Sequence, residues 1–413
     1  MQPVENAKIS NEMRASRKDN KETLAIFFIQ PFIAFLCAIS QLRNKYSFAV
    51  IFLFFVLFGF TFLAQNESFD SFRYVQQFYQ YIPYDLAQYQ HDLADFFTLK
   101  SKVKDLYVIS SYFIVSKFTS NYHVLMALWA MVFSFFCLKS FRFFVDRPEF
   151  GKSLAVFLLA FLFLSSNSIF NINGVRFWTA AWVAVYVVFE IMVNGNYKFI
   201  ALSLLTPLIH ISYLFFVGVL IVFLLARKFE NVWILLFFVS FFVSEISIRL
   251  FQNYQEHLPL VIQNMIWSYA AEENLAEHQR ILERIPLYAK ILNSLPRYFI
   301  NLLMVVFIGY YKRMWLFKNG RVIFVFLLIW LSFVNFTMSI LSFGSRFIVL
   351  SVPFVCYLGL LTYKHIPMLP KLIYLIPVVY SYSILYWCRA MISVTDPCLI
   401  ISVFPHIIIK NLL

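Results

Sequence analysis

Four short motifs place ionisable side chains next to long apolar runs of the sequence. In chain order they are Asp70–Tyr74, Asn173–Arg176, Leu208–Ser212 and Ser345–Phe347. Lipid strongly disfavours a charged side chain, so an ionisable residue within or beside a membrane-spanning run indicates a functional site. Because one chain carries four such motifs, we expect their side chains to meet at one face of a membrane.

The side chains in these motifs offer two kinds of chemistry. The guanidinium groups of Arg73, Arg176 and Arg346 form forked hydrogen bonds that suit phosphate oxygens. The imidazole of His210 and the carboxylate of Asp70 can each accept a proton from a reacting hydroxyl. Ordinary structural roles stay open as well. Asp70 and Arg73 can pair at a helix start, the other arginines can extend to lipid headgroups, and His210 can be a structural hydrogen-bonding residue.

The composition indicates which elements must position these side chains. Of the 413 residues, 61% are hydrophobic, 20% are aromatic and 13% are charged. Soluble domains carry about 25% charged residues, so this chain lacks the polar surface that such a domain needs. Its formal net charge of +13 comes largely from lysines and arginines in short gaps between apolar runs. Such gaps are typical of cytoplasmic loops, so the charge does not indicate nucleic-acid binding.

The apolar runs predict helices that cross a membrane. A crossing takes about 20 apolar residues, and the runs predict an all-α polytopic integral membrane protein of about ten to twelve transmembrane helices. We expect a single transmembrane domain over residues 24–413, preceded by a polar segment over residues 1–23 without the features of a signal peptide. The clear runs are Ser47–Ala64, Tyr122–Leu138, Ser153–Ile169, Val175–Val193, Val232–Ile248, Arg297–Tyr311, Val322–Ser342, Phe347–Tyr363 and Leu372–Cys388; the weaker ones are Leu24–Ile39, Leu106–Phe118 and Leu399–Ile409.

The basic gaps orient these helices. Gaps at 139–152 and 312–321 are the richest in lysine and arginine, and both are placed inside. Arg227 is also placed inside, and so is the end of the run before Phe199. The segment Phe199–Leu225 must then enter and leave the membrane on the same side. It is too short for two full crossings, so we predict a re-entrant or broken helix pair with its break near Pro207–His210.

This orientation puts two longer polar segments outside, at residues 65–105 and 251–296. The charges from Glu273 to Arg284 have the spacing of an amphipathic helix that lies at the membrane surface. An alternative topology counts Val103–Ser120 as a full crossing and puts residues 65–102 inside. Lysines near the start of that run favour the alternative, and both topologies stay open at this point.

In their order and rough spacing, the four motifs resemble the EpsG-like family of bacterial exopolysaccharide and O-antigen polymerases of the Wzy kind. The likeness runs from about Phe28 to Tyr363, and the long polar N-terminus departs from the family pattern. It implies a membrane enzyme that polymerises undecaprenyl-diphosphate-linked oligosaccharide repeat units into O-antigen, capsule or exopolysaccharide. The resemblance also implies that this polymerisation takes place at the periplasmic face of the bacterial inner membrane. The resemblance implies His210 and Asp70 as catalytic residues, and as substrate-binding residues Arg73, Tyr74, Asn173, Arg176 and Arg346.

The expected chemistry follows from the substrate class. Glycosyl transfer passes through an oxocarbenium-like state and releases an anionic diphosphate, whose growing charge arginines can stabilise. The incoming sugar hydroxyl loses a proton that a histidine or a carboxylate can accept. No Asp-x-Asp pair indicates a divalent metal, so we expect neither a metal nor another cofactor. The implied partners are the bilayer, the lipid-linked oligosaccharide, a flippase and a chain-length regulator, and not nucleic acid.

Three other functions satisfy the same motifs in part. A flippase or other transporter of lipid-linked oligosaccharides would bind the same substrate, although such transporters often contain internal repeats and none is present here. A ligase that moves the finished polymer to lipid A would need similar arginine and histidine side chains. A non-catalytic subunit of an export complex would need only the membrane helices.

Overall fold

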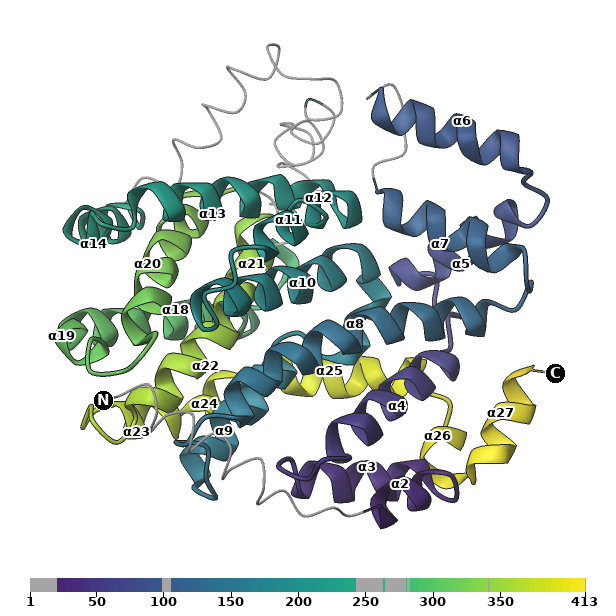
Figure 1. The fold of residues 1–413 in the computed structure, drawn as a ribbon, viewed down its shortest axis with the longest axis horizontal. Coiled ribbons are helices and arrows are strands. Elements are labelled where there is room, and N and C mark those ends of the chain that lie inside the picture. The colour runs from purple at the N-terminus through teal and green to yellow at the C-terminus, as the bar shows by residue number, and fades with distance from the viewer. Residues whose placement is uncertain are drawn as a thin grey trace.

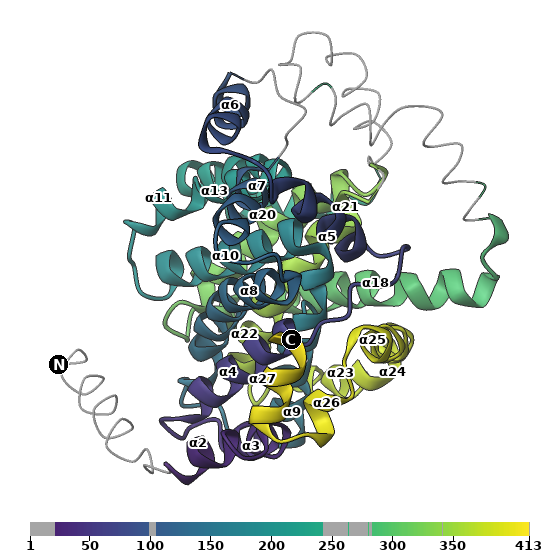
Figure 2. The ribbon, with the colours of Figure 1, turned by 90° about the vertical axis from the view of Figure 1, so that its right-hand side faces the viewer.

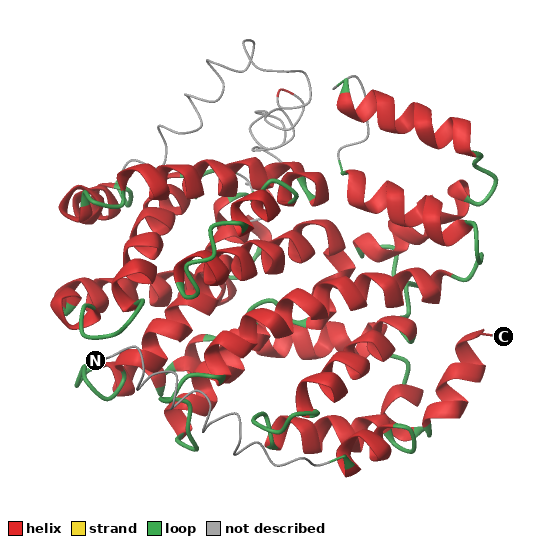
Figure 3. Cartoon of the chain, in the orientation of Figure 1, coloured by secondary structure: helices red, strands yellow, loops and turns green. Residues whose placement is uncertain are grey.

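The computed structural model describes residues 21–98, 105–242, 283–340 and 342–412, with the single positions 263 and 280. Within these ranges the regular structure is helical, and the one strand-like feature is an isolated bridge between Phe62 and Thr395 (Figure 3). The predicted all-α fold is therefore confirmed. The predicted amphipathic helix between Glu273 and Arg284 falls almost entirely outside the described residues.

The first helices of the chain lie along the lower edge and the right-hand side of Figure 1 and include two long helices of its centre. They are α2 (Glu22–Phe27), α3 (Pro31–Ser40), α4 (Ser47–Phe60), α5 (Asp70–Tyr81), α6 (Leu86–Phe97), α7 (Leu106–Ser116), α8 (Tyr122–Val145), α9 (Leu154–Ser165), the 3-10 helix η1 (Ile169–Gly174) and α10 (Val175–Met192). The next group is α11 (Phe199–Ser203), α12 (Thr206–Ile209), the 3-10 helix η2 (Ile211–Tyr213), α13 (Leu214–Ala226) and α14 (Glu230–Val239).

The remaining helices close the bundle and pack mainly against α9, α13 and α14. They are α18 (Leu287–Gly309), α19 (Tyr311–Met314), α20 (Gly320–Phe336), α21 (Gly344–Phe347), the 3-10 helix η4 (Ile348–Leu350), α22 (Ser351–Thr362), α23 (Leu369–Ile373), α24 (Ile376–Val379), α25 (Ser381–Val394), α26 (Cys398–Ile401) and α27 (Phe404–Leu412). Almost the whole of α22 is buried, so it forms part of the centre of the bundle.

Several helical segments are long and apolar enough to cross a membrane. Four meet this condition: Tyr122–Val145, Leu154–Met192, Leu287–Gly309 and Gly344–Thr362. A fifth is the pair Leu369–Val379 and Ser381–Val394, bent by 43° at Tyr380. Other predicted crossings fall on shorter apolar helices of 10–17 residues, such as α4 and α20. The described helices thus make the chain a multi-pass membrane protein, with four or five crossings of full length.

The predicted break near Pro207–His210 is present. Helix α12 ends at Ile209, and His210 has an extended backbone with φ −153° and ψ 119° before η2 begins. Pro207 lies in the first turn of α12, where its missing N–H costs nothing. The chain therefore interrupts helical hydrogen bonding at the one histidine of this apolar segment. The bend at Tyr380 was not expected, because the sequence reads as one unbroken run there.

Glycine allows α4 and α8 to approach closely in the core. A β-carbon at Gly59 in α4 would lie 2.5 Å from Cβ of Ala130 and 2.6 Å from the carbonyl oxygen of Met126 in α8. Real carbon atoms do not approach so closely, so any larger residue would force α4 away from α8. Most other helix contacts in the core are made by large aromatic and aliphatic side chains.

Helices α5, α6 and α7 gather at one end of the molecule, beside the start of α8, on the right in Figure 1 and toward the viewer in Figure 2. Helix α7 has 11 residues, which span about 17 Å at 1.5 Å per residue, roughly half of the hydrocarbon thickness. It does not cross a membrane by itself. The motif around Asp70 opens α5, so this end of the molecule holds the first of the four motifs.

We predict that residues 65–105 lie outside, and a cysteine on α6 tests this. Gln88 is unsuitable because its side chain closes a capping box with Asp85, so Gln90, which is exposed on the same helix, is the better position. In a variant whose exposed Cys388 is replaced by serine, Gln90→Cys should react with an impermeant maleimide added outside. Lys318→Cys, in a gap predicted to be inside, is the matched control. Labelling of Gln90→Cys only from the cytoplasmic side would reverse the topology.

Candidate active site

The third and fourth motifs meet at the ring of Phe177, which directly follows the second motif near the start of α10. The imidazole of His210 meets this ring edge-on, with ring centroids 5.5 Å apart. The guanidinium carbon of Arg346 lies 5.8 Å from the ring centroid, within the range of a cation–π contact. Phe347 packs on the same ring at 5.1 Å. One aromatic side chain therefore brings the break at His210 next to the arginine of α21.

Arg176 lies in a network that joins three segments. Its Nη1 donates to Oδ2 of Asp105 at 2.6 Å, and its Nε donates to the hydroxyl of Tyr74 at 3.0 Å. The second carboxylate oxygen of Asp105 accepts the backbone N–H of Ile211 at 3.2 Å. The side chain of Asp105 is 3% exposed and that of Arg176 is 36% exposed. This ion pair therefore connects the starts of α7 and α10 to the residue that follows His210.

Tyr74 completes this network from α5. Burial raises the pKa of its phenol, Arg176 lowers it, and Asp70 raises it again, with a net increase. The hydroxyl consequently stays protonated at neutral pH and serves as the acceptor of the Arg176 hydrogen bond. Its ring packs edge-on against buried Trp129 at 5.7 Å. These contacts give Tyr74 a positioning role for Arg176.

The side chain of His210 is held by Ser212. Its Nδ1 lies 2.8 Å from the Ser212 hydroxyl oxygen and accepts the Ser212 backbone N–H at 3.2 Å. The hydroxyl can donate or accept and so fits either tautomer of the ring, whereas the backbone N–H bonds only to an unprotonated Nδ1. A base at Nε2 therefore requires Nδ1 to exchange the backbone contact for donation to the hydroxyl. The ring is half-buried. Ser212 thereby fixes the orientation of the imidazole and takes part in deciding which nitrogen carries the proton.

The side chains around Phe177 and Arg176 form one cluster, with His210, Arg346, Asp105 and Tyr74. Asp70 and Arg73 lie at its exposed edge. They form an ion pair with each other, and their side chains are 38% and 69% exposed. This is the helix-start pairing that the sequence left open. Asn173 accepts the backbone N–H of Ser71 at 3.1 Å through its side-chain oxygen, and so satisfies one of the free donors at the start of α5. Asn173 thus attaches α5 to η1.

The charges of the cluster leave one arginine without an acid. Asp70 pairs with Arg73, and Asp105 pairs with Arg176. No carboxylate in the described part of the chain pairs with Arg346, which is half-buried. Within the same ranges, no three histidine, cysteine, aspartate or glutamate side chains gather closely enough to hold a metal ion. The free positive charge beside His210 makes Arg346 the guanidinium best placed to bind an anion.

Asp105 is the one central residue that the sequence did not single out. It occupies the N-cap position of α7, yet its side chain makes no capping hydrogen bond and turns to Arg176 instead. The signal available in the sequence was weak: one acidic residue between Lys104 and an apolar run, which is also typical of an ordinary helix start. All seven predicted residues lie in or at the edge of the cluster, while their chemical roles remain predictions.

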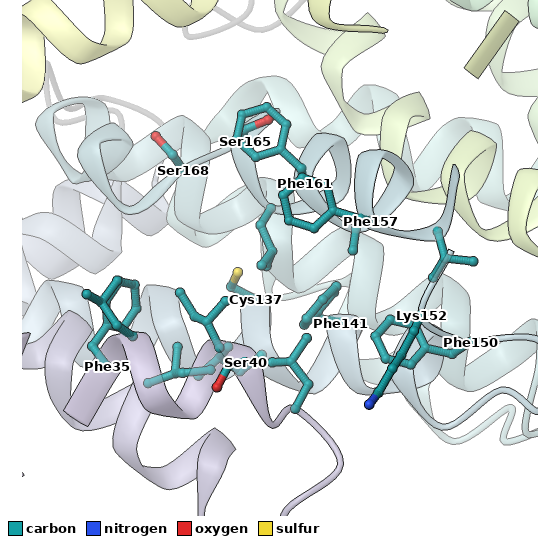
Figure 4. A pocket seen from close by; sticks show the side chains of 18 of the residues that line it. Phe35, Ser40, Cys137, Phe141, Phe150, Lys152, Phe157, Phe161, Ser165 and Ser168 are labelled. Carbon is teal, nitrogen blue, oxygen red and sulfur yellow. The ribbon is translucent and has the colours of Figure 1, made fainter. Parts of the chain in front are cut away.

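A cavity elsewhere in the described chain has a different character. It measures about 790 Å³ and runs between α3, α4, α8 and α9, with phenylalanines along its walls (Figure 4). Lys152 is the one charged residue among those described in its lining. Such a surface suits hydrocarbon and offers no group that could move a proton or bind a diphosphate. The side chains that could together bind an anion and move a proton therefore lie around His210 and not in this cavity.

Comparison with known proteins gives one match. The model of the EpsG family matches residues 45–399. No curated protein and no solved structure matches the chain. The matched range includes all four motifs and also Asp105.

Proposed function

Because the chain belongs to the EpsG family, which is linked to exopolysaccharide synthesis, we propose that it is a polymerase of lipid-linked glycans. In this proposal it joins undecaprenyl-diphosphate-linked oligosaccharide repeat units at the periplasmic face of the bacterial inner membrane. The observation that carries the proposal is the arrangement around Phe177. A guanidinium that pairs with no carboxylate of the described residues and an imidazole contact the same ring, from α21 and from the break before η2.

The proposed reaction uses the two groups on opposite sides of the bond that breaks. A hydroxyl of one repeat unit attacks the anomeric carbon of another, and the bond from that carbon to the diphosphate oxygen breaks. The hydroxyl proton passes to His210, and undecaprenyl diphosphate leaves as the anion. Arg346 stabilises the charge that grows on the leaving oxygen. In a largely apolar site the attraction between a guanidinium and a phosphate is stronger than in water.

The contacts of Arg176 support a modified role for this residue. The resemblance implied both Arg176 and Arg346 as substrate-binding residues, whose guanidinium groups suit phosphate oxygens. Two nitrogens of Arg176 are already used by Asp105 and Tyr74. We therefore assign the forked contact with the diphosphate to Arg346. We assign to Arg176 the role of holding α7, α10 and the segment around His210 in their relative positions. Asp70 and Arg73, which are paired and exposed, then border the entrance for the sugar.

Purified protein with a synthetic undecaprenyl-linked repeat unit tests the proposal. A polymerase yields a ladder of products, each longer by one repeat unit. A flippase moves the unit across a vesicle membrane and forms no new glycosidic bond. A ligase transfers it only when lipid A is supplied. Either of these two results, in a preparation that is folded and contains lipid, would replace the polymerase assignment.

Arg346→Lys should reduce the polymerisation rate at normal protein abundance. Lysine keeps the charge but loses the fork. The loss of one charge-assisted hydrogen bond to the leaving diphosphate corresponds to about 10- to 100-fold in rate. The initial rate of ladder formation measures it. Arg142→Lys, an exposed residue of the basic gap 139–152, is the control and should polymerise normally. A near-normal rate in Arg346→Lys would contradict the assignment of the forked contact.

A further inference from the structure

A small polar cavity lies where the ends of α10 and α13 meet the turn before α20. It measures about 260 Å³. Backbone and polar side chains form much of its wall, in contrast to the phenylalanine-lined cavity of Figure 4. The two charged residues among those described in its lining are both cations, Arg227 and Lys318, and both side chains reach solvent. A polar wall with two accessible cations favours an anion as the ligand.

Two tight turns build this cavity. Gly195 follows α10 with a φ of 70°, and Asn319 precedes α20 with a φ of 71°. Few residue types adopt this left-handed conformation readily, and glycine and asparagine are among them. The side-chain nitrogen of Asn319 donates to the carbonyl oxygen of Val193 at 3.0 Å. This bond connects the two turns, so residues 126 positions apart in the sequence form one wall.

The neighbouring acids have other partners. Glu190 accepts a hydrogen bond from the side-chain nitrogen of Asn194 at 2.8 Å, and Glu230 accepts one from Nε of Arg321 at 2.6 Å. Nη1 of Arg227 has a tyrosine hydroxyl 3.5 Å away, at the outer limit of a hydrogen bond. Among the described residues, no acceptor holds the rest of this guanidinium. Its fork is therefore available to phosphate oxygens.

This end of the molecule has the features of a boundary between lipid and water. The ends of α10 and α13 and the gap 312–321, which are all predicted to lie inside, meet here. Tyr197 and Trp315 are 50% and 52% exposed, as is typical of the aromatic belt at a membrane interface. Ile221 and Leu225 are 51% and 77% exposed and lie one turn apart on α13, which ends beside Arg227. A phospholipid supplies a phosphate for the cavity and an acyl chain for this apolar stripe, whereas a soluble anion would use the cavity alone.

We infer that this cavity binds the phosphate of an anionic phospholipid from the cytoplasmic leaflet, such as phosphatidylglycerol. Arg227 and Lys318 contact the phosphate oxygens, and one acyl chain follows Ile221 and Leu225. Basic pockets between membrane helices bind lipid head groups in this way. The bound lipid joins the end of α13 to α10 and α20. Because α13 begins just after the break at His210, the lipid steadies the helix that carries this segment. The inference does not depend on which reaction the protein catalyses.

Photo-crosslinking to the full-length protein in detergent micelles tests this inference. The probe is phosphatidylglycerol with a diazirine in one acyl chain. We expect it to label the peptide that contains Ile221 and Leu225, and unlabelled phosphatidylglycerol should compete better than phosphatidylcholine. In the double variant Arg227→Gln with Lys318→Gln, the probe concentration for half-maximal labelling of this peptide should rise about 10- to 100-fold, because charged hydrogen bonds are lost.

The matched control removes two positive charges from exposed positions outside the lining. It combines Lys228→Gln with Arg313→Gln and should be labelled like wild type. All four side chains are exposed, so both double variants should accumulate normally. Equal competition by phosphatidylcholine, or wild-type labelling of the variant that lacks Arg227 and Lys318, would overturn the inference. Glycerol phosphate or inorganic phosphate that competes as well as phosphatidylglycerol would overturn a lipid ligand and assign the cavity to a soluble phosphate.

Discussion

Replacing Asp105 with alanine is expected to destabilise the protein strongly and to stop polymer formation. The carboxylate is 3% exposed and pairs with Arg176 at 2.6 Å, and removing it leaves a guanidinium with a lost partner in a largely buried setting. Breaking a buried pair in this way costs about 3–5 kcal/mol. We expect a value near the lower limit, because the Arg176 side chain is 36% exposed and solvent screens it in part. Ile211 also loses the acceptor of its N–H beside His210.

A double-mutant cycle separates the ion pair from the other roles of Asp105. Asp105→Asn combined with Arg176→Gln leaves no unpaired charge, so the double variant should be more stable than the sum of the single losses predicts. Thermal unfolding in detergent and protein abundance measure this. The control is Asp146→Ala: the ion pair of Asp146 with Arg142 is exposed, and its loss should cost about 0–1 kcal/mol. Wild-type stability of Asp105→Ala would show that the pair does not hold α7 to α10.

Local signals in the sequence were sufficient for the fold class and for the broken helix. The length of the apolar runs predicts membrane helices because the hydrocarbon leaves few other backbone structures. Pro207, inside an apolar run too short for two crossings, placed the break within a few residues, and the structure has it at His210. Gln30 and Pro31 likewise end one helix and begin the next, with Gln30 capping α3. These signals act over a few neighbouring residues, so one sequence reveals them.

Contacts between distant residues could not be predicted in the same way. Asp105 reads as the cap of α7, and only the folded chain shows that its carboxylate turns to Arg176. Arg297 was taken as the start of an apolar run, whereas α18 begins at Leu287 and places Arg297 inside the helix. For Asp105 the partner is supplied by another helix, and no spacing along the chain encodes it. The bend at Tyr380 is different, because Pro377 opens α24 just before it and was a local signal inside a run that was taken as unbroken.

His210→Gln is expected to leave the protein folded and to reduce the polymerisation rate by about 10²- to 10⁴-fold, the usual contribution of a general base. Glutamine can keep a hydrogen bond to Ser212 but cannot accept a proton near neutral pH. If His210 instead has a structural role, His210→Ala should lower abundance and His210→Gln should restore both abundance and rate. Abundance and single-turnover rates, measured side by side, separate the two roles. Full wild-type rate in His210→Gln would exclude the base and leave Asp70 as the next candidate.

Ser212→Ala provides a sharper test of how the imidazole works. For Nε2 to take the proton of the sugar hydroxyl, Nδ1 must carry a hydrogen and donate it to the Ser212 hydroxyl, 2.8 Å away. Without that hydroxyl, the Ser212 backbone N–H at 3.2 Å remains near Nδ1 and favours the tautomer with the proton on Nε2. That tautomer cannot act as the base. A net hydrogen bond of about 1 kcal/mol then corresponds to a loss of about fivefold in rate. Ser166→Ala, whose hydroxyl bonds only to the carbonyl oxygen of Phe163 within the described chain, is the control. An unchanged rate in Ser212→Ala, together with a large loss in His210→Gln, would show that His210 orients the hydroxyl through Nε2–H and that another group takes the proton.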